Sequence, residues 1–368
     1  MGMVSTSILT TSDESYKSVR DHPIISFLRV PSWEDRGLFV GQICRQPGAR
    51  IDNYGRNDKG SYTQIQGGVG TQHIISIGDF DRDGIDRLLD HAGQIDKKKF
   101  DPDALAGKIL AVLFFEPSTR TRMSFESAIA RLGGTSISVG SVDACSMAKG
   151  ETLADTIRVV SGYADAIVIR HPKEGAARLA AEFSAVPVIN AGDGAGQHPS
   201  QTLLDLYTIR QSMPIDGIDI ALVGDLRYGR TAHSLASALS LYNARLHTVS
   251  PNGLELPQTL AATLRDKGME IIEHDDIREV IPDVDVLYVT RIQRERFPDS
   301  ASYFNVSSSN RITPELLEDT RKHLIVLHPL PRVDEIDPRV DKSPHAKYFE
   351  QSRNGVPMRM AMLLQVLQ

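Results

Sequence analysis

From His73 onward, short apolar runs alternate with amphipathic stretches along the chain. The short runs are typical of β-strands, and the stretches between them are typical of helices that bury one face. In Ser124–Leu132, for example, apolar residues recur at helical spacing, and Gly133-Gly134 marks the expected end of that helix. The pattern predicts strands at Ile109–Phe115, Ala166–Ile169, Val186–Ile189, Ile220–Val223, Leu246–Val249, Val286–Val289 and Leu324–Leu327.

This alternation predicts an α/β fold, because strand–helix–strand units of this length form parallel sheets with helices on both faces. A break is expected near residues 200–218, where a long helix is followed by the turn Met213-Pro214. We therefore expect two doubly wound parallel-sheet domains. The expected divisions are a flexible N-terminal extension at 1–70, domains at 71–205 and 206–350, and a C-terminal helix at 351–368 that packs back on the first domain.

The first 70 residues differ in composition from the rest. Residues 46–70 in particular are rich in Gly, Asn, Asp and Gln and contain few aliphatic side chains, which is typical of linkers and disordered segments. The sequence therefore indicates no role for residues 1–70.

The overall composition narrows the function. Of 368 residues, 41 are Lys or Arg and 47 are Asp or Glu, and the net charge of −6 argues against a general binder of nucleic acid or anionic membranes. Two cysteines exclude a disulfide framework and a cysteine-rich zinc site. Histidines and carboxylates show no metal-ligand spacing, and no apolar run approaches the ~18 residues that span a bilayer. We expect a soluble, cytoplasmic protein without a metal or other cofactor.

A cluster of hydroxyl and guanidinium groups follows the first predicted strand, in the segment Phe114–Arg122 (FFEPSTRTR). Ligands of such sheets bind at the carboxyl ends of the strands, and a helix N-terminus offers free N–H groups and a partial positive charge to a phosphate. Ser118, Thr119 and Thr121 add hydroxyls, and Arg120 adds a guanidinium that can bind phosphate through two hydrogen bonds. The segment predicts a phosphate site; the alternative is a helix cap with two solvated arginines.

A second glycine-containing turn, Gly224–Thr231, also lies between a strand and a helix. Its spacing is similar to that of a P-loop, but Arg230 stands at the position of the lysine, and no apolar strand ending in a metal-binding Asp accompanies it. An NTPase is therefore the weaker interpretation of this turn.

The segment Phe114–Arg122 also resembles the carbamoyl-phosphate signature of the aspartate and ornithine transcarbamoylases. The resemblance runs from His73 to the C-terminus, about four-fifths of the chain. In the ornithine-using members a Cys typically stands where this chain has Pro329, and arginines gather in the second half of this chain, as a dicarboxylate substrate demands. The resemblance therefore favours the aspartate-using branch. It includes Lys149–Thr152 (KGET), Arg170–Pro172 (RHP), Asn190–Gln201 (NAGDGAGQHPSQ), Val223–Thr231 (VGDLRYGRT), Thr290–Arg294 (TRIQR) and His328–Arg332 (HPLPR).

The resemblance implies that the carbamoyl group of carbamoyl phosphate passes to the amine of L-aspartate, a step of pyrimidine biosynthesis. It also implies that the active site lies in the cleft between the two domains. It implies that Arg120, Thr121, Lys149, Arg170 and His198 are the catalytic residues. For carbamoyl phosphate, the resemblance implies that the phosphate binds to Ser118, Thr119, Arg120 and Thr121, and that the carbonyl oxygen contacts Thr121, Arg170 and His198. The carbamoyl amino group would contact Gln201 and the backbone carbonyls near Leu330 and Pro331. For aspartate, it implies that Arg230 binds the α-carboxylate and that Arg291 and Gln293 bind the β-carboxylate.

In this family a mobile loop reaches the active site of a neighbouring subunit, with a Ser and a Lys at the phosphate. Lys149 matches the Lys, but Cys145 stands at the usual Ser position, with Ser146 beside it. The departure puts the hydroxyl contact of this loop in doubt. A shared site of this kind implies a homotrimer; the alternative for Lys149 is a solvated loop cation.

Three functions remain open from the sequence. The first is carbamoyl transfer to aspartate, the second is an ornithine-type or other carbamoyltransferase, and the third is a non-catalytic member of the family. The sequence leaves open whether a regulatory chain or another enzyme of the pathway binds.

Overall fold

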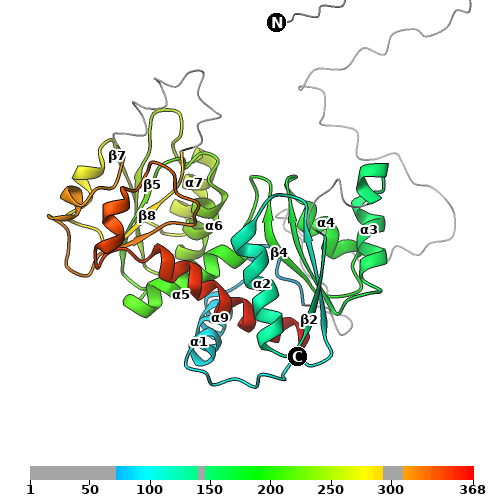
Figure 1. Ribbon diagram of the computed structural model, residues 1–368. Helices are drawn as coiled ribbons and strands as arrows, with labels where there is room; N and C mark the ends of the chain where they lie inside the picture. The colour runs from blue at the N-terminus through cyan, green and yellow to red at the C-terminus, as the bar shows by residue number, and fades with distance from the viewer. Residues whose placement is uncertain (1–71, 140–145, 293–309) are drawn as a thin grey trace, which may run out of the picture. The chain divides into compact units, whose positions relative to one another are not determined.

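The computed structural model describes residues 72–139, 146–292 and 310–368. Its strands form two sheets in which all strand pairs are parallel. The first sheet has the order β2-β1-β3-β4, and the second has the order β7-β6-β5-β8-β9. Figure 1 shows the two sheets as separate groups of strands. These two parallel-sheet lobes confirm the predicted fold class. The strands are β1 (Ile109–Phe114), β2 (Thr135–Val139), β3 (Ala166–His171), β4 (Val188–Asp193), β5 (Asp219–Val223), β6 (Arg245–Val249), β7 (Ile271–His274), β8 (Val286–Val289) and β9 (Ile325–Leu327).

Helices alternate with these strands along the chain. They are α1 (Arg82–Asp96), α2 (Thr119–Arg131), α3 (Leu153–Val160), α4 (Ala176–Phe183), α5 (Pro199–Ser212), α6 (Arg230–Leu239), α7 (Gln258–Asp266) and α9 (Tyr348–Leu367). No helix in the described ranges is both long and apolar enough to cross a bilayer.

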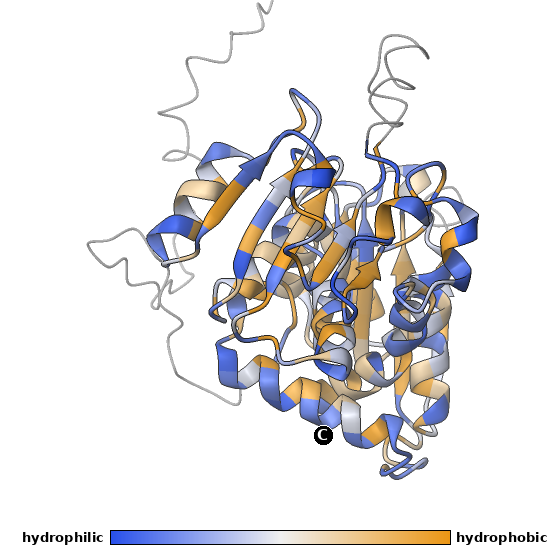
Figure 2. Cartoon of the chain, turned by 90° about the vertical axis from the view of Figure 1, so that its left-hand side faces the viewer, coloured by the Kyte–Doolittle hydropathy of each residue, from blue (hydrophilic) through white to orange (hydrophobic). Residues whose placement is uncertain are grey.

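Both sheets are buried on both faces, which is why most of their strands are continuous apolar runs. Along β1, alternate side chains from Leu110 to Phe114 face a central core, and the side chains between them face a second core. Along β5, Ile220 and Leu222 belong to the same central core, and the side chains between them face a third. One hydrophobic core is therefore shared by the two lobes, and apolar strands lie between more polar helix surfaces (Figure 2).

The helices α5 and α9 contribute to this central core. α5 is buried continuously from Pro199 to Ile209. α9 packs against α1, α2 and α5 (Figure 1). The expected domain boundary at 205/206 falls inside α5, which is a continuous helix, and α9 begins at Tyr348 rather than at residue 351.

Two strands were not predicted, and both lie at sheet edges. β2 and β7 are first or last in their sheets, and their side chains are only partly buried, so neither forms a continuous apolar run. The helix predicted at Ser124–Leu132 begins five residues earlier, at Thr119, so the hydroxyl-rich segment forms its first turn. The predicted extension at 1–70 lies outside the described residues.

Candidate active site

A cavity of about 220 Å³ lies at the carboxyl ends of strands from both sheets. The first lobe contributes the segment after β1, Arg170 at the end of β3, and His198 after β4. The second lobe contributes Arg230 after β5 and the loop His328–Pro331 after β9. This is the edge at which parallel α/β sheets bind ligands.

Three helices begin at this cavity. Ser118, His198 and Gly229 are the N-cap residues of α2, α5 and α6, and none of these caps makes a side-chain hydrogen bond to its helix. None of the three helices has an acidic residue in its first turn. The partial positive charges of the three N-termini therefore stay available to an anion; α5 begins with Pro199, which has no N–H to offer.

Four arginines, Arg120, Arg170, Arg230 and Arg359, line the cavity, and none of its lining residues is a carboxylate. This charge distribution favours a ligand with more than one negative charge. Within the described ranges, no group of three or more His, Cys, Asp or Glu side chains is placed to hold a metal ion.

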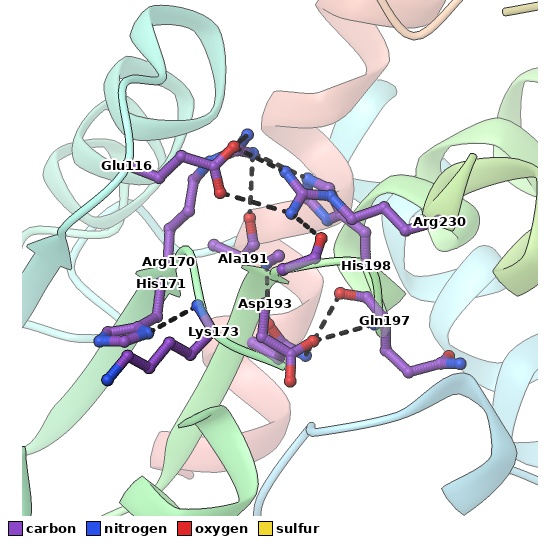
Figure 3. Close-up of polar contacts among 12 residues, drawn as sticks. Glu116, Arg170, His171, Lys173, Ala191, Asp193, Gln197, His198 and Arg230 are labelled. Carbon is purple, nitrogen blue, oxygen red and sulfur yellow. Dashed lines mark hydrogen bonds and ion pairs between the residues drawn. The ribbon is translucent and has the colours of Figure 1, made fainter. Parts of the chain in front are cut away.

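Glu116 joins two of these arginines across the lobes (Figure 3). Its Oε1 accepts a hydrogen bond from Arg170 Nη2 at 2.7 Å and another from Arg230 Nη2 at 3.0 Å. Burial alone raises the pKa of Glu116, but the two guanidinium groups outweigh it and hold the pKa below its usual value. Glu116 is therefore ionised near neutral pH and orients both guanidinium groups.

His198 is almost fully buried beside the same arginines. Its Nε2 lies 3.5 Å from Arg170 Nη1, and its Nδ1 lies 3.3 Å from the hydroxyl of Ser200. Burial, and then the positive charges of Arg170 and Arg230, lower the pKa of His198 well below its usual value. His198 is therefore neutral near pH 7.

Gly192 allows these side chains to approach one another. Its φ of +114° is a conformation that side-chain-bearing residues rarely adopt. A Cβ at this position would lie 3.3 Å from Arg230 Cζ, 3.3 Å from His198 Cδ2 and 3.4 Å from Arg170 Nη1. Asp193, next in the chain, fixes the loop by accepting a hydrogen bond from Gln197 N at 2.9 Å (Figure 3). It accepts another from Gly175 N at 2.9 Å.

The loop after β9 is held by His328. Its Nδ1 accepts a hydrogen bond from Leu330 N at 2.8 Å, and its Nε2 donates to Glu335 Oε1 at 2.7 Å. Its backbone N–H donates to Gln351 Oε1 at 2.8 Å. These contacts anchor the Leu330-Pro331 segment at the cavity, where the peptide bond is cis.

The structure brings most of the predicted site residues together. Those that line the cavity are Ser118, Arg120, Thr121, Arg170, His198, Gln201, Arg230, Leu330 and Pro331.

The remaining predicted residues lie elsewhere or outside the description. Thr119, exposed at the start of α2, and Arg291, after β8, are not among the lining residues. Lys149, exposed at the end of the short helix Ser146–Lys149, does not line the cavity of its own chain either. Gln293 and Cys145 lie outside the described residues.

Sequence reasoning missed three residues of this site. Glu116 lies inside the segment that predicts the phosphate site, and its place among the hydroxyls and arginines of that segment is the signal that could have found it. Gln351 and Arg359 come from α9, more than 100 residues from the other first-lobe groups. The available signal for Arg359 was a charged residue inside the apolar run Met358–Leu364.

The arrangement is suited to hold a small dianion beside a second, carboxylate-bearing ligand. Helix N-termini, hydroxyls and arginines supply donors and positive charge from the first lobe, and Arg230 supplies a planar guanidinium from the second. A buried, neutral imidazole completes a set of hydrogen-bond donors that could stabilise a developing oxyanion.

Comparisons with known proteins agree with this chemistry. Residues 72–211 match the family model of the aspartate/ornithine carbamoyltransferase carbamoyl-P binding domain, and residues 216–366 match the model of the Asp/Orn binding domain. The aspartate carbamoyltransferase catalytic subunit of Methanosphaerula palustris is 74% identical over 294 residues, which cover 80% of this chain and 99% of the relative. That of Methanoculleus marisnigri is 70% identical over 295 residues, with coverages of 80% and 99%.

Solved structures show the same relationship. The catalytic subunit of M. jannaschii aspartate transcarbamoylase has a TM-score of 0.76 and 54% identity, and the match covers 80% of this chain and 97% of that one. Aspartate transcarbamoylase from Trypanosoma cruzi, in complex with N-(phosphonacetyl)-L-aspartic acid, has a TM-score of 0.76 and 40% identity, with coverages of 82% and 97%. The two matched domains span nearly all of the chain beyond residue 71, and the chain belongs to the aspartate/ornithine carbamoyltransferase family.

Proposed function

We propose that this protein transfers the carbamoyl group of carbamoyl phosphate to L-aspartate, giving N-carbamoyl-L-aspartate and phosphate, a step of pyrimidine biosynthesis. The observation that carries the proposal is the convergence of three helix N-termini and four arginines, from both lobes, on one cavity without a lining carboxylate. The relatives support the choice of substrates, since the T. cruzi enzyme has been solved in complex with carbamoyl phosphate and aspartate.

In this proposal the phosphate binds at the start of α2. Ser118, Thr119 and Thr121 offer hydroxyls, and Arg120 offers a guanidinium, next to the free N–H groups of the first helical turn. These groups also stabilise the phosphate as it departs with the electron pair of the C–O bond.

The carbonyl oxygen of the carbamoyl group lies toward Thr121, Arg170 and His198. As the amine of aspartate attacks the carbonyl carbon, a C–N bond forms and this oxygen gains negative charge. Each preorganised donor is typically worth ~3 kcal/mol at that moment. The C–O bond to phosphate then breaks, and the departing phosphate takes the proton from the amine.

The other groups orient the substrates. Gln201 and the backbone carbonyls near Leu330 and Pro331 accept hydrogen bonds from the carbamoyl amino group. Arg230 binds the α-carboxylate of aspartate, and Arg291 with Gln293 binds the β-carboxylate. Holding amine and carbonyl in line can supply several kcal/mol of the rate enhancement.

The experiment is a steady-state assay with carbamoyl phosphate and either L-aspartate or L-ornithine. We expect L-aspartate to give carbamoyl-aspartate and L-ornithine to give no citrulline. Arg230→Gln should raise the KM for aspartate, because the planar guanidinium that binds the carboxylate is lost. Arg227→Gln is the matched control, since Arg227 is exposed and donates to Gly253 O at 3.2 Å. Preference for ornithine would favour the ornithine-type alternative, and no transfer at all would favour a non-catalytic member.

We further propose a homotrimer in which Lys149 of one subunit completes the site of its neighbour. Support comes from the exposure of Lys149 and its position away from the cavity of its own chain. The catalytic-subunit names of the relatives leave a regulatory chain or a pathway enzyme open as a further partner. A cytoplasmic location belongs to the same proposal; its support is the low cysteine content, two in 368 residues, typical of proteins that fold without disulfides.

Mixed oligomers test the shared site. Lys149→Ala and Arg120→Ala chains, each inactive alone, should regain activity when mixed and reassembled. Random trimers from equal amounts would contain about a quarter of intact sites, because each site draws its two halves independently in a closed ring. Native mass spectrometry confirms that hybrids form. Hybrids without activity would place Lys149 in its own chain or outside the reaction.

A further inference from the structure

A fully buried carboxylate that the proposed chemistry does not use lies directly beneath the cavity. Asp205, on α5, has no exposed surface. Its Oδ1 accepts hydrogen bonds from Gln201 Nε2 at 2.8 Å and from Gln351 Nε2 at 2.6 Å. Its Oδ2 accepts one from the hydroxyl of Tyr288 at 2.9 Å. The partners come from α5, α9 and β8, so Asp205 connects both lobes with the C-terminal helix.

An ionised carboxylate accepts hydrogen bonds but donates none, and this selects the orientation of both amides. Gln201 and Gln351 must turn their nitrogens toward Asp205, so their oxygens point away from it. The oxygen of Gln351 accepts the backbone N–H of His328, at the start of the loop that carries Leu330 and Pro331. The oxygen of Gln201 is left for the cavity that this residue lines.

The burial of Asp205 is unfavourable and is partly offset by its surroundings. Burial raises the pKa of Asp205 to about 7, while Gln351, Gln201, Tyr288 and the charge of Arg359 oppose that rise. Arg359 is itself buried, with a pKa lowered by burial to about 10, so it stays protonated near neutral pH. If this residue served packing alone, a neutral side chain of the same size would fill the position with a smaller free-energy penalty of burial.

We infer that Asp205 is a positioning residue for carbamoyl transfer: its carboxylate orients the amide oxygen of Gln201 and, through Gln351, anchors the His328–Pro331 loop. This inference rests on the proposed function, in which Gln201 and the Leu330 and Pro331 carbonyls accept hydrogen bonds from the carbamoyl amino group. One buried carboxylate thus sets the orientation of both acceptors of the same amino group.

The first test is a double-mutant cycle, assayed at pH 8.5 where Asp205 is ionised. Asp205→Asn keeps the size of the side chain, but its amide both donates and accepts hydrogen bonds. Either the nitrogen or the oxygen of the Gln201 amide can then face position 205, so the orientation of Gln201 is no longer fixed. We expect kcat/KM for carbamoyl phosphate to fall roughly 10- to 100-fold. Because the loss passes largely through Gln201, the Asp205→Asn/Gln201→Ala double variant should lose at least about fivefold less than the product of the single losses. Losses that multiply fully would overturn the inference.

Inorganic phosphate separates positioning from a general collapse of the cavity. Phosphate lacks the amino group, so Asp205→Asn should leave its inhibition constant within about threefold of wild type. Tyr242→Phe is the matched control, because it removes a tyrosine–aspartate hydrogen bond of the same length, to Asp86 Oδ1 at 2.9 Å, and neither residue lines the cavity; it should change kcat/KM by less than about threefold. A loss of phosphate affinity equal to the loss of kcat/KM would assign Asp205 a structural role only.

A pair swap keeps the inference testable if Asp205→Asn alone does not fold. Gln201→Glu places two carboxyl groups in contact and should be poorly active. Adding Asp205→Asn restores a donor to the new Glu and should raise kcat/KM at least about fivefold over Gln201→Glu. No rescue would contradict the inference. Wild-type enzyme is assayed in parallel: if it transfers no carbamoyl group, the proposed function fails, whereas an active wild type without coupling rejects the role of Asp205 alone.

Discussion

Replacing Glu116 with Gln tests whether the link between the two lobes matters for the reaction. Glu116 Oε1 accepts hydrogen bonds from Arg170 Nη2 at 2.7 Å and from Arg230 Nη2 at 3.0 Å. All three side chains are mostly buried, with exposed fractions of 28% for Glu116, 12% for Arg170 and 15% for Arg230. Gln keeps the size and one oxygen, but it loses the charge and places an NH₂ group near a guanidinium.

The size of the effect follows from these contacts. A hydrogen bond to a charged group contributes about 1.5–3 kcal/mol and a neutral one about 0.5–1.5 kcal/mol. Weakening two such contacts therefore costs on the order of 1–3 kcal/mol, after allowing for partial solvent screening. Since 1.4 kcal/mol is about tenfold in rate, kcat/KM for aspartate should fall roughly 10- to 100-fold.

The assay is steady-state kinetics with aspartate varied at saturating carbamoyl phosphate. Glu126→Gln is the matched control, because Glu126 pairs with Arg122 at 3.0 Å along α2, and neither residue lines the cavity. That variant should stay within about threefold of wild type. If Glu116→Gln behaves like Glu126→Gln, the carboxylate does not orient the arginines during turnover and the reasoning fails.

Three further outcomes are expected. Arg120→Ala should lower kcat at least ~10²-fold while its circular dichroism spectrum stays unchanged. Arg122→Ala is the control and should keep its kcat, because Arg122 does not line the cavity. Near-normal turnover of Arg120→Ala would contradict the phosphate site. Gly192→Ala should lower the free energy of unfolding in urea by about 1–3 kcal/mol and should also lower kcat/KM. The reason is that φ of Gly192 is +114° and the Cβ of the new Ala would contact three site residues. An unchanged free energy of unfolding and an unchanged kcat/KM would argue against this close approach.

The third outcome concerns stability and pH. The folded-state pKa of Asp205, about 7, lies above its unfolded value of 3.8. Protonation of Asp205 therefore adds to the free energy of unfolding: this stabilisation is fully present below pH 3.8 and is lost as the pH rises toward 7. The difference of about 3 units corresponds to on the order of 4 kcal/mol. Asp205→Asn should therefore lose less stability than wild type between pH 5 and pH 8, as measured by urea unfolding at one protein concentration. Parallel pH dependences would refute this account.

The strands inside each sheet could be predicted from the sequence because their burial on both faces makes them apolar throughout. β8 was predicted at its observed bounds, and the other interior strands shifted by only a few residues. β2 and β7 could not be found in this way, because these two edge strands are only partly buried and mix polar with apolar side chains, whereas the edge strands β4 and β9 are fully buried. The expected boundary at 205/206 falls inside α5, whose extent is hard to read from the sequence because a helix that is buried along its length carries no amphipathic stripe.

The site was predictable where its residues lie in one continuous segment. Ser118, Arg120 and Thr121 follow a strand and begin a helix, so local chemistry indicated a phosphate site, whereas the roles of Arg170, His198 and Arg230 rested on the family resemblance. Gln351 and Arg359 could not be placed, because only the packing of α9 against α1, α2 and α5 brings them to the cavity.

The position of α9 also has a consequence for the order of events during synthesis. Every other element that lines the cavity leaves the ribosome before α9 does, yet α9 supplies Gln351, Arg359 and the apolar side chains Met358–Leu364. Until α9 emerges, α1, α2 and α5 lack the surface they pack against, and the nascent chain exposes apolar faces that chaperones bind. The α9 side chains of the cavity and the completed central core are therefore acquired together.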